Sequence, residues 1–97
     1  MHRDPEAAQL AAVLRQMAAL LQRHDKAEWA RKLDLCRVII ENSDIHGVAR
    51  LLELYRGRRS LNQVVLGVVA DDKGFAALRA QAWAMGQRIR RKAGSGE

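Results

Sequence analysis

The sequence is poor in the residues that build disulfide-rich or β-rich domains. Its 97 residues include one cysteine, one proline and few aromatic residues, namely two Trp, one Tyr and one Phe. A single cysteine, Cys36, excludes a disulfide within the chain, and nothing else indicates an oxidising compartment. Scarce aromatic residues beside abundant alanine and leucine favour helices over a β-sandwich.

Long apolar runs are also missing. No stretch approaches the roughly 20 uninterrupted apolar residues that a membrane span requires. Charged residues precede and interrupt the apolar positions near the N-terminus, a pattern that does not fit a signal peptide. We therefore expect a soluble, cytoplasmic protein.

Signatures of enzymes are absent from the sequence. It contains no glycine-rich phosphate loop, no Gly-x-Ser-x-Gly elbow and no His-Glu-x-x-His motif. The three histidines, His2, His24 and His46, are scattered, and with one cysteine they give no metal-ligand spacing. We expect a protein without catalytic activity, cofactor or bound metal.

The positive charge of +6 is concentrated in the second half of the chain. Residues 1–55 hold eight basic and eight acidic residues, whereas residues 56–97 hold nine basic and three acidic residues. Such a basic half indicates an acidic partner, which could be a protein surface, nucleic acid or phosphate groups. A soluble basic protein without such a partner remains the alternative.

Helical periodicity of the apolar residues predicts an all-α fold, a compact bundle of four to five short helices with antiparallel neighbours. We expect one domain over residues 1–92 and a disordered tail over 93–97. Asp4 and Pro5 mark the start of a first helix that ends near His24. Cys36 falls on the apolar stripe of the second helix, where a buried, inert thiol is expected.

Short polar segments separate the next helices. Asp25, with Glu28 three residues later, predicts the cap of the second helix. A third helix is expected over residues 45–55, with Gly47 marking close packing or the approach of a ligand. Gly57 suits the left-handed position just past the end of that helix.

The segment that follows can be interpreted in two ways. Ser60 and Gln63 match a capping box, which predicts a fourth helix through about Ala70. The β-branched residues at 64–69 leave a buried strand as the competing interpretation. A turn and a helix cap are expected at Asp71-Asp72-Lys73-Gly74, followed by a last helix over residues 75–92.

Two basic clusters are candidate binding sites. Arg56, Arg58 and Arg59 precede the expected helix start at Ser60, where cations are unfavourable unless something acidic compensates them. With Asn62 they form the predicted partner-binding site. A secondary basic patch is expected at the end of the last helix, where the helix dipole alone could also account for it: Arg88, Arg90, Arg91 and Lys92.

Some apolar residues allow a second kind of interface. Leu35, Ile39 and Trp83 could form the seam of a homodimer. A wider monomer core explains the same residues equally well.

Part of the sequence resembles a family of small uncharacterised bacterial proteins, in which a Trp-Ala helix leads to a Gly-Ser-Leu-Asn-Asp segment and a final helix. The resemblance covers about residues 25–90, with Arg58-Arg59 and Gln63 departing from the family pattern. The residues that carry it are Trp29-Ala30 with Leu33; Asp44, Gly47-Val48, Leu51-Leu52, Tyr55 and Gly57; and Ser60-Leu61-Asn62 with Val65-Leu66.

The last forty residues are also similar, more weakly, to small helical immunity proteins of type VI secretion effectors. Leu66-Gly67-Val68-Val69-Ala70, Ala82 and Gly86 carry this similarity. It implies a protein that binds and blocks a cognate toxin, and neither resemblance supplies a catalytic residue.

These observations lead to one function and one alternative. We expect a protein-binding module of the immunity or antitoxin type, which uses its arginines against an acidic partner. The alternative is a nucleic-acid-binding protein that uses the basic C-terminal half.

Overall fold

The computed structural model describes residues 5–95, and their side chains through residue 93. This part of the chain contains α-helices and no strand, so the predicted all-α bundle is confirmed for it. The elements are α1 (Pro5–Arg23), α2 (Ala27–Glu41), α3 (His46–Glu53), the 3₁₀ turn η1 (Leu61–Gln63) and α4 (Val69–Ser95). Asp4, the expected cap of the first helix, lies outside the described residues.

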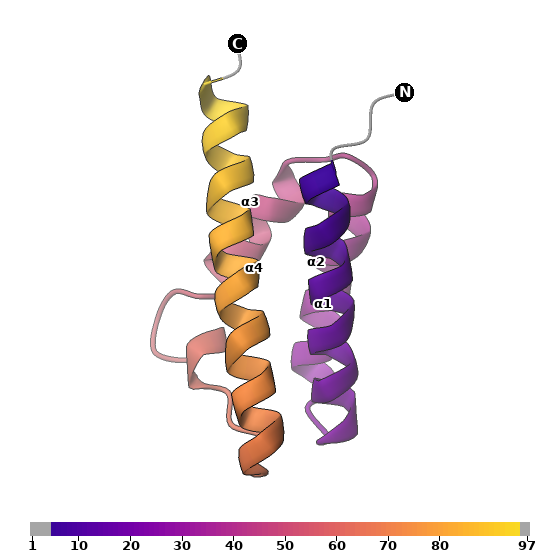
Figure 1. Cartoon of the computed structure of the whole chain (residues 1–97), viewed down its shortest axis with the longest axis vertical. Coiled ribbons are helices and arrows are strands. Elements are labelled where there is room, and N and C mark those ends of the chain that lie inside the picture. Colours follow the sequence, from indigo (N-terminus) through magenta and orange to yellow (C-terminus); the bar gives the residue numbers. More distant parts are fainter. Residues whose placement is uncertain (1–4, 96–97) are drawn as a thin grey trace.

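The helices enclose a single apolar core. α1 and α4 lie side by side, α2 packs behind α1, and the short α3 crosses behind, near the end where α1 begins (Figure 1). The largest fully buried side chains come from every α-helix and from η1: Phe75, Leu10, Leu14, Met17, Leu21, Leu33, Leu51 and Leu61. Burying one such side chain stabilises the fold by about 1.5–3 kcal/mol, so these residues supply the main driving force.

Cys36 is part of this core, as the sequence predicted. Only 2% of the residue is exposed, and it forms no disulfide. Burial raises the pKa of the Cys36 thiol, which keeps it protonated and unreactive.

The corner between α1 and α2 differs from the prediction. Asp25 adopts a left-handed conformation with φ of 60°, and the next residue, Lys26, donates its backbone N–H to the carbonyl of Leu21 at 2.8 Å. Asp25 therefore lies just past the end of α1, in a left-handed conformation that aspartate tolerates. The expected cap of the second helix at Asp25 is wrong, because Lys26 occupies that position and makes no side-chain cap hydrogen bond.

Close packing at Gly47 is confirmed. A Cβ atom at this position would lie 2.7 Å from Cγ1 of Ile40 and 2.8 Å from the Ile40 backbone nitrogen. Only a residue without a side chain lets α3 approach the end of α2 this closely.

The expected fourth helix over residues 60–70 is wrong, and so is the competing strand. Helical structure is limited to the three residues of η1, and the chain is then irregular up to α4. The cap itself is present, because the Ser60 hydroxyl accepts a hydrogen bond from the Asn62 N–H at 3.2 Å. Val64 and Val65 disfavour a helix because they are β-branched. Gly67 has a φ of 94°, which is incompatible with a right-handed helix at this position.

α4 is longer than predicted at both ends. Asp71-Asp72-Lys73-Gly74 lies inside the helix, so the expected turn there is wrong. The carboxylates of Asp71 and Asp72 accept hydrogen bonds at the start of α4. Asp71 accepts one from His24 at 2.7 Å, and Asp72 accepts one from the backbone N–H of Leu66 in the preceding loop. At the other end the helix includes residues 93–95, which were expected to be disordered.

Candidate partner-binding surface

The segment 54–68 between α3 and α4 is held at both ends. The N–H of Leu61 donates to the carbonyl of Leu54 at 2.7 Å, and Leu61 itself is fully buried. At the other end the Asp72 carboxylate accepts hydrogen bonds from the N–H groups of Leu66, at 2.7 Å, and Gly67, at 3.1 Å. The residues between these points are therefore presented in a defined position, although they have little regular structure.

One face of this segment forms a hollow of about 370 Å³ against the start of α2. We call it the basic hollow. Its lining residues are Lys26, Trp29, Arg58, Arg59, Ser60, Gln63, Val64 and Val65.

The basic hollow is electrostatically one-sided. Lys26, Arg58 and Arg59 line it, and no carboxylate does. Among the described residues none of these cations has an ion-pair partner within 4.0 Å. A further cation, Lys32, lies 4.8 Å from the centre of the Trp29 ring. Such a hollow favours an anionic group from outside the chain.

The structure divides the residues predicted for partner binding. Arg58 and Arg59 lie together in the basic hollow, as expected. Arg56 does not line it, and its guanidinium lies 3.5 Å from the carboxylate of Glu53 on α3. Asn62, in η1, does not line the basic hollow and instead lines a second hollow.

This second hollow, the aromatic hollow, has a volume of about 350 Å³. Its lining residues come from the end of α3, from η1 and from α4: Tyr55, Asn62, Ala76, Arg79, Ala80 and Trp83. The rings of Tyr55 and Trp83 are 4.9 Å apart and inclined by 50°. The Tyr55 hydroxyl donates to the carbonyl of Arg79 at 2.6 Å, and burial raises the pKa of Tyr55, so the hydroxyl stays protonated and keeps this hydrogen bond.

Sequence reasoning missed most of the residues around these hollows. Trp29 packs against the core while it also lines the basic hollow. Lys26 was expected only to lie within the capping box between Asp25 and Glu28. Ala76, Ala80 and Trp83 follow one another at spacings of four and three residues, and that helical spacing was the available signal for the aromatic hollow.

The secondary basic patch at the end of α4 is partly used within the fold. Arg88 Nε and Lys92 Nζ each lie 2.7 Å from the carboxylate of Glu6 on α1. Hydrogen bonds from Lys92 and then Arg88 lower the pKa of Glu6. Arg90 and Arg91 are exposed. Two of the four predicted residues therefore connect α4 to α1.

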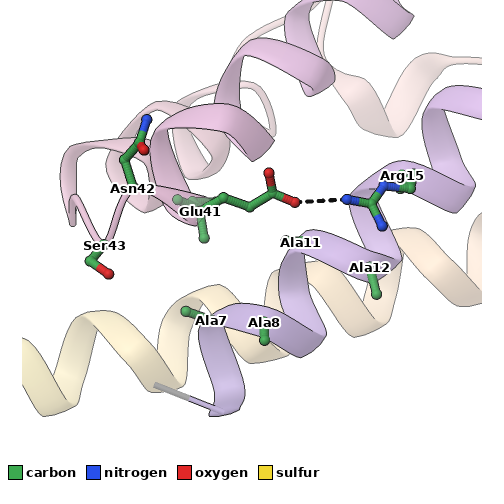
Figure 2. A pocket seen from close by; sticks show the side chains of 9 residues that line it. Ala7, Ala8, Ala11, Ala12, Arg15, Glu41, Asn42 and Ser43 are labelled. Carbon is green, nitrogen blue, oxygen red and sulfur yellow. Dashed lines mark hydrogen bonds and ion pairs between the residues drawn. The ribbon is translucent and has the colours of Figure 1, made fainter. Parts of the chain in front are cut away.

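A third hollow, of about 520 Å³, lies between α1 and the end of α2. Figure 2 shows four alanines of α1 on one side and the Arg15–Glu41 ion pair, 2.8 Å long, across it. The charges that line it are already paired, and its alanines offer no side-chain donor or acceptor. The hollow is a consequence of small side chains and is a weaker candidate than the basic hollow.

Metal-binding and membrane-spanning features are absent from the part of the chain that the structure describes. No group of three or more His, Cys, Asp or Glu residues there could hold a metal ion. None of its helices is both long enough and apolar enough to cross a membrane. His46 is an exposed surface residue, and its ring lies 2.8 Å from the Asp44 carboxylate.

The comparisons with known proteins add no assignment. No protein-family model matches this chain, and neither a curated protein nor a solved structure matches it. The proposals below are therefore supported by the geometry of the two hollows.

Proposed function

We propose that this protein is a small binding module that occludes an acidic surface of a partner protein, in the manner of an immunity or antitoxin-like inhibitor. The observation that carries the proposal is the basic hollow, in which Lys26, Arg58 and Arg59 meet no carboxylate. Arginine anchors beside a partly buried tryptophan are typical of the residues that dominate protein interfaces. Buried Cys36 is compatible with the cytoplasm, where we expect the protein to act.

Exposed aliphatic residues favour a protein partner over nucleic acid. Val65, Val68 and Val69 are 64%, 48% and 74% exposed. Val65 and Val68 belong to the segment 54–68, and Val69 is the first residue of α4. Protein–nucleic acid interfaces are polar and would leave these side chains without an apolar surface to cover them. A protein partner can bury them while its carboxylates meet the arginines.

The arginines can be tested by charge reversal. In the double variant Arg58→Glu/Arg59→Glu the hollow would repel an acidic partner, so we expect at least a hundredfold loss of affinity, largely through faster dissociation of the complex. Affinity capture from the source cells, with the partner identified by mass spectrometry, would provide the complex. Kinetics measured with the purified pair would then give the effect.

A matched control separates local from global charge. Arg31→Glu/Arg50→Glu changes the net charge by the same amount, and neither residue lines the basic hollow. This control should retain binding, with only a salt-dependent decrease in association rate. Equal losses in both variants, or an unchanged complex in the first, would refute the proposed site.

Nucleic acid is the second candidate, because of the concentration of basic residues after position 55. A labelled duplex and a labelled single strand, each titrated between 50 and 200 mM salt, distinguish the two functions. A steep loss of affinity with salt, on the order of 10³-fold, would support nucleic acid. No binding at low salt would remove this candidate.

A further inference from the structure

The aromatic hollow combines an open apolar wall with polar groups that the fold uses only in part. Ala76 and Ala80 leave space beside Trp83, which is 39% exposed. Arg79 makes one long hydrogen bond, from Nη1 to the Leu61 carbonyl at 3.4 Å. Within the described residues no carboxylate lies within 4.0 Å of its guanidinium.

Each of the two hollows is lined by one residue of η1. Gln63 lines the basic hollow, and the preceding residue, Asn62, lines the aromatic hollow. Both residues belong to the three-residue η1, in which successive residues rise by about 2 Å along the axis. A single short segment of a partner could therefore reach both hollows.

We infer that the aromatic hollow is the second anchoring point of the proposed partner surface, and that it receives an aliphatic side chain flanked by carboxylates on an acidic segment of the partner protein. The inference rests on the function proposed above and specifies the partner's chemistry. Arg79 would meet a carboxylate next to the apolar side chain, while the remaining carboxylates of the segment enter the basic hollow. Neither hollow has a carboxylate in its lining that would repel such a segment.

The shape of the aromatic wall favours an aliphatic side chain over a nucleobase. The rings of Tyr55 and Trp83 are inclined by 50°, so together they form an angular wall rather than a flat platform. A branched side chain such as leucine can fill the angle beside Ala80. A base stacks best on an open, planar face.

The two tryptophans of the chain allow each hollow to be observed separately. Trp29 lines the basic hollow and Trp83 the aromatic hollow. Trp29→Phe leaves Trp83 as the only tryptophan, and Trp83→Phe leaves Trp29 as the only one. Fluorescence of these two variants reports which hollow a probe enters.

Three synthetic probes test the inference: a heptapeptide with a central leucine between six glutamates, the same peptide with a central serine, and an oligothymidylate ten nucleotides long. We expect the leucine peptide to shift the Trp83 emission to shorter wavelength and to bind about tenfold more tightly than the serine peptide. Both peptides should change the Trp29 emission, because both carry the glutamates.

A substitution that fills the hollow provides the second measurement. Ala80→Phe should remove the advantage of the leucine peptide over the serine peptide. Ala84→Phe, also at an exposed position of α4 but outside the lining, should retain that advantage. Circular dichroism would establish that both variants keep the helical fold.

The outcomes separate this inference from the proposed function. Equal affinity for the two peptides, with a response from Trp29 alone, would overturn the aromatic anchor and leave the basic hollow intact. No response from either tryptophan would overturn both. Tighter binding of the oligothymidylate than of the leucine peptide would replace the acidic protein segment with nucleic acid.

Discussion

The contact between α2 and α3 leaves no room for a side chain at position 47, where the residue is glycine. In Gly47→Ala the new Cβ would meet the side chain and the backbone of Ile40 at less than 3.0 Å. Backbone atoms cannot move aside as a flexible side chain can, so we expect a destabilisation of about 1–3 kcal/mol in urea denaturation.

Gly74 is the matched control for this substitution. It lies within α4, and a Cβ at this position would meet nothing within 4 Å. Gly74→Ala should therefore stabilise the protein by roughly 0.5–1 kcal/mol, because alanine has the higher helix propensity. A destabilised Gly74→Ala, or a neutral Gly47→Ala, would contradict the packing described for these helices.

Individual residues were predictable where one local interaction determines their role. The buried thiol of Cys36 follows from its position in the apolar stripe, and the cap at Ser60 from the hydroxyl and the residues after it. Asp25 was mispredicted because the same residue type suits both a helix start and the left-handed end of a preceding helix. The local sequence did not decide between the two.

Among the elements, the loop before α4 depends on one carboxylate. Asp72 accepts hydrogen bonds from two consecutive N–H groups, those of Leu66 and Gly67. Asp72→Ala should cost about 1–2 kcal/mol of stability and accelerate amide hydrogen exchange at both positions. Asp72→Asn keeps one acceptor oxygen and should give an intermediate result, measured by the same exchange experiment.

The same exchange experiment shows whether Asp72 stabilises the loop alone or the whole of α4. If exchange accelerates equally throughout α4, the carboxylate supports the whole helix rather than the loop. Acceleration confined to residues 64–68 would support the arrangement described.

The sequence of residues 64–69 was not sufficient to predict the conformation of the loop before α4. Their valines predict extended backbone, and the capping box before them predicts helix. In the structure the tertiary contacts decide: Leu61 and Leu66 are buried, while Asp72 fixes the chain between them and α4. Asp72 was interpreted as part of a turn and of a helix cap, so its hydrogen bonds to the loop before α4 were not recognised.

Ion pairs connect the first helix of the molecule, α1, to its last helix, α4. Glu6 on α1 accepts hydrogen bonds from Arg88 and Lys92 on α4, and these lower the pKa of Glu6. A carboxyl with a lowered folded-state pKa contributes stability above its unfolded pKa and loses that contribution as the pH falls through the folded value. Glu6→Gln should therefore lower the Tm at pH 7, and the difference from wild type should disappear well below the ordinary glutamate pKa of about 4.3.

Glu53→Gln is the control for this pH dependence. Glu53 pairs with Arg56 at 3.5 Å, and both side chains are about 70% exposed. Thermal unfolding should show a smaller change in this variant at every pH. An equal change in both variants would indicate a general charge effect instead of a contact between α1 and α4.

At this scale the fold class was predictable and the surface was not. The apolar periodicity of each helix is a local property, and it was sufficient to predict a bundle. The basic hollow joins Lys26 and Trp29 to Arg58 and Arg59, which are about thirty positions away in the sequence. Proximity of this kind depends on how α2 and the 54–68 segment pack, and a single sequence does not encode it in any local pattern.

The burial of Cys36 has a further consequence for how this molecule can be studied. It is the only thiol in the chain, and it lies on the buried face of α2. A thiol reagent can reach it only when the packing of α2 opens, because its sulfur is not accessible in the closed fold. The labelling rate therefore measures how often the bundle opens. A partner that binds both α2 and the 54–68 segment would lower this labelling rate without contacting the cysteine.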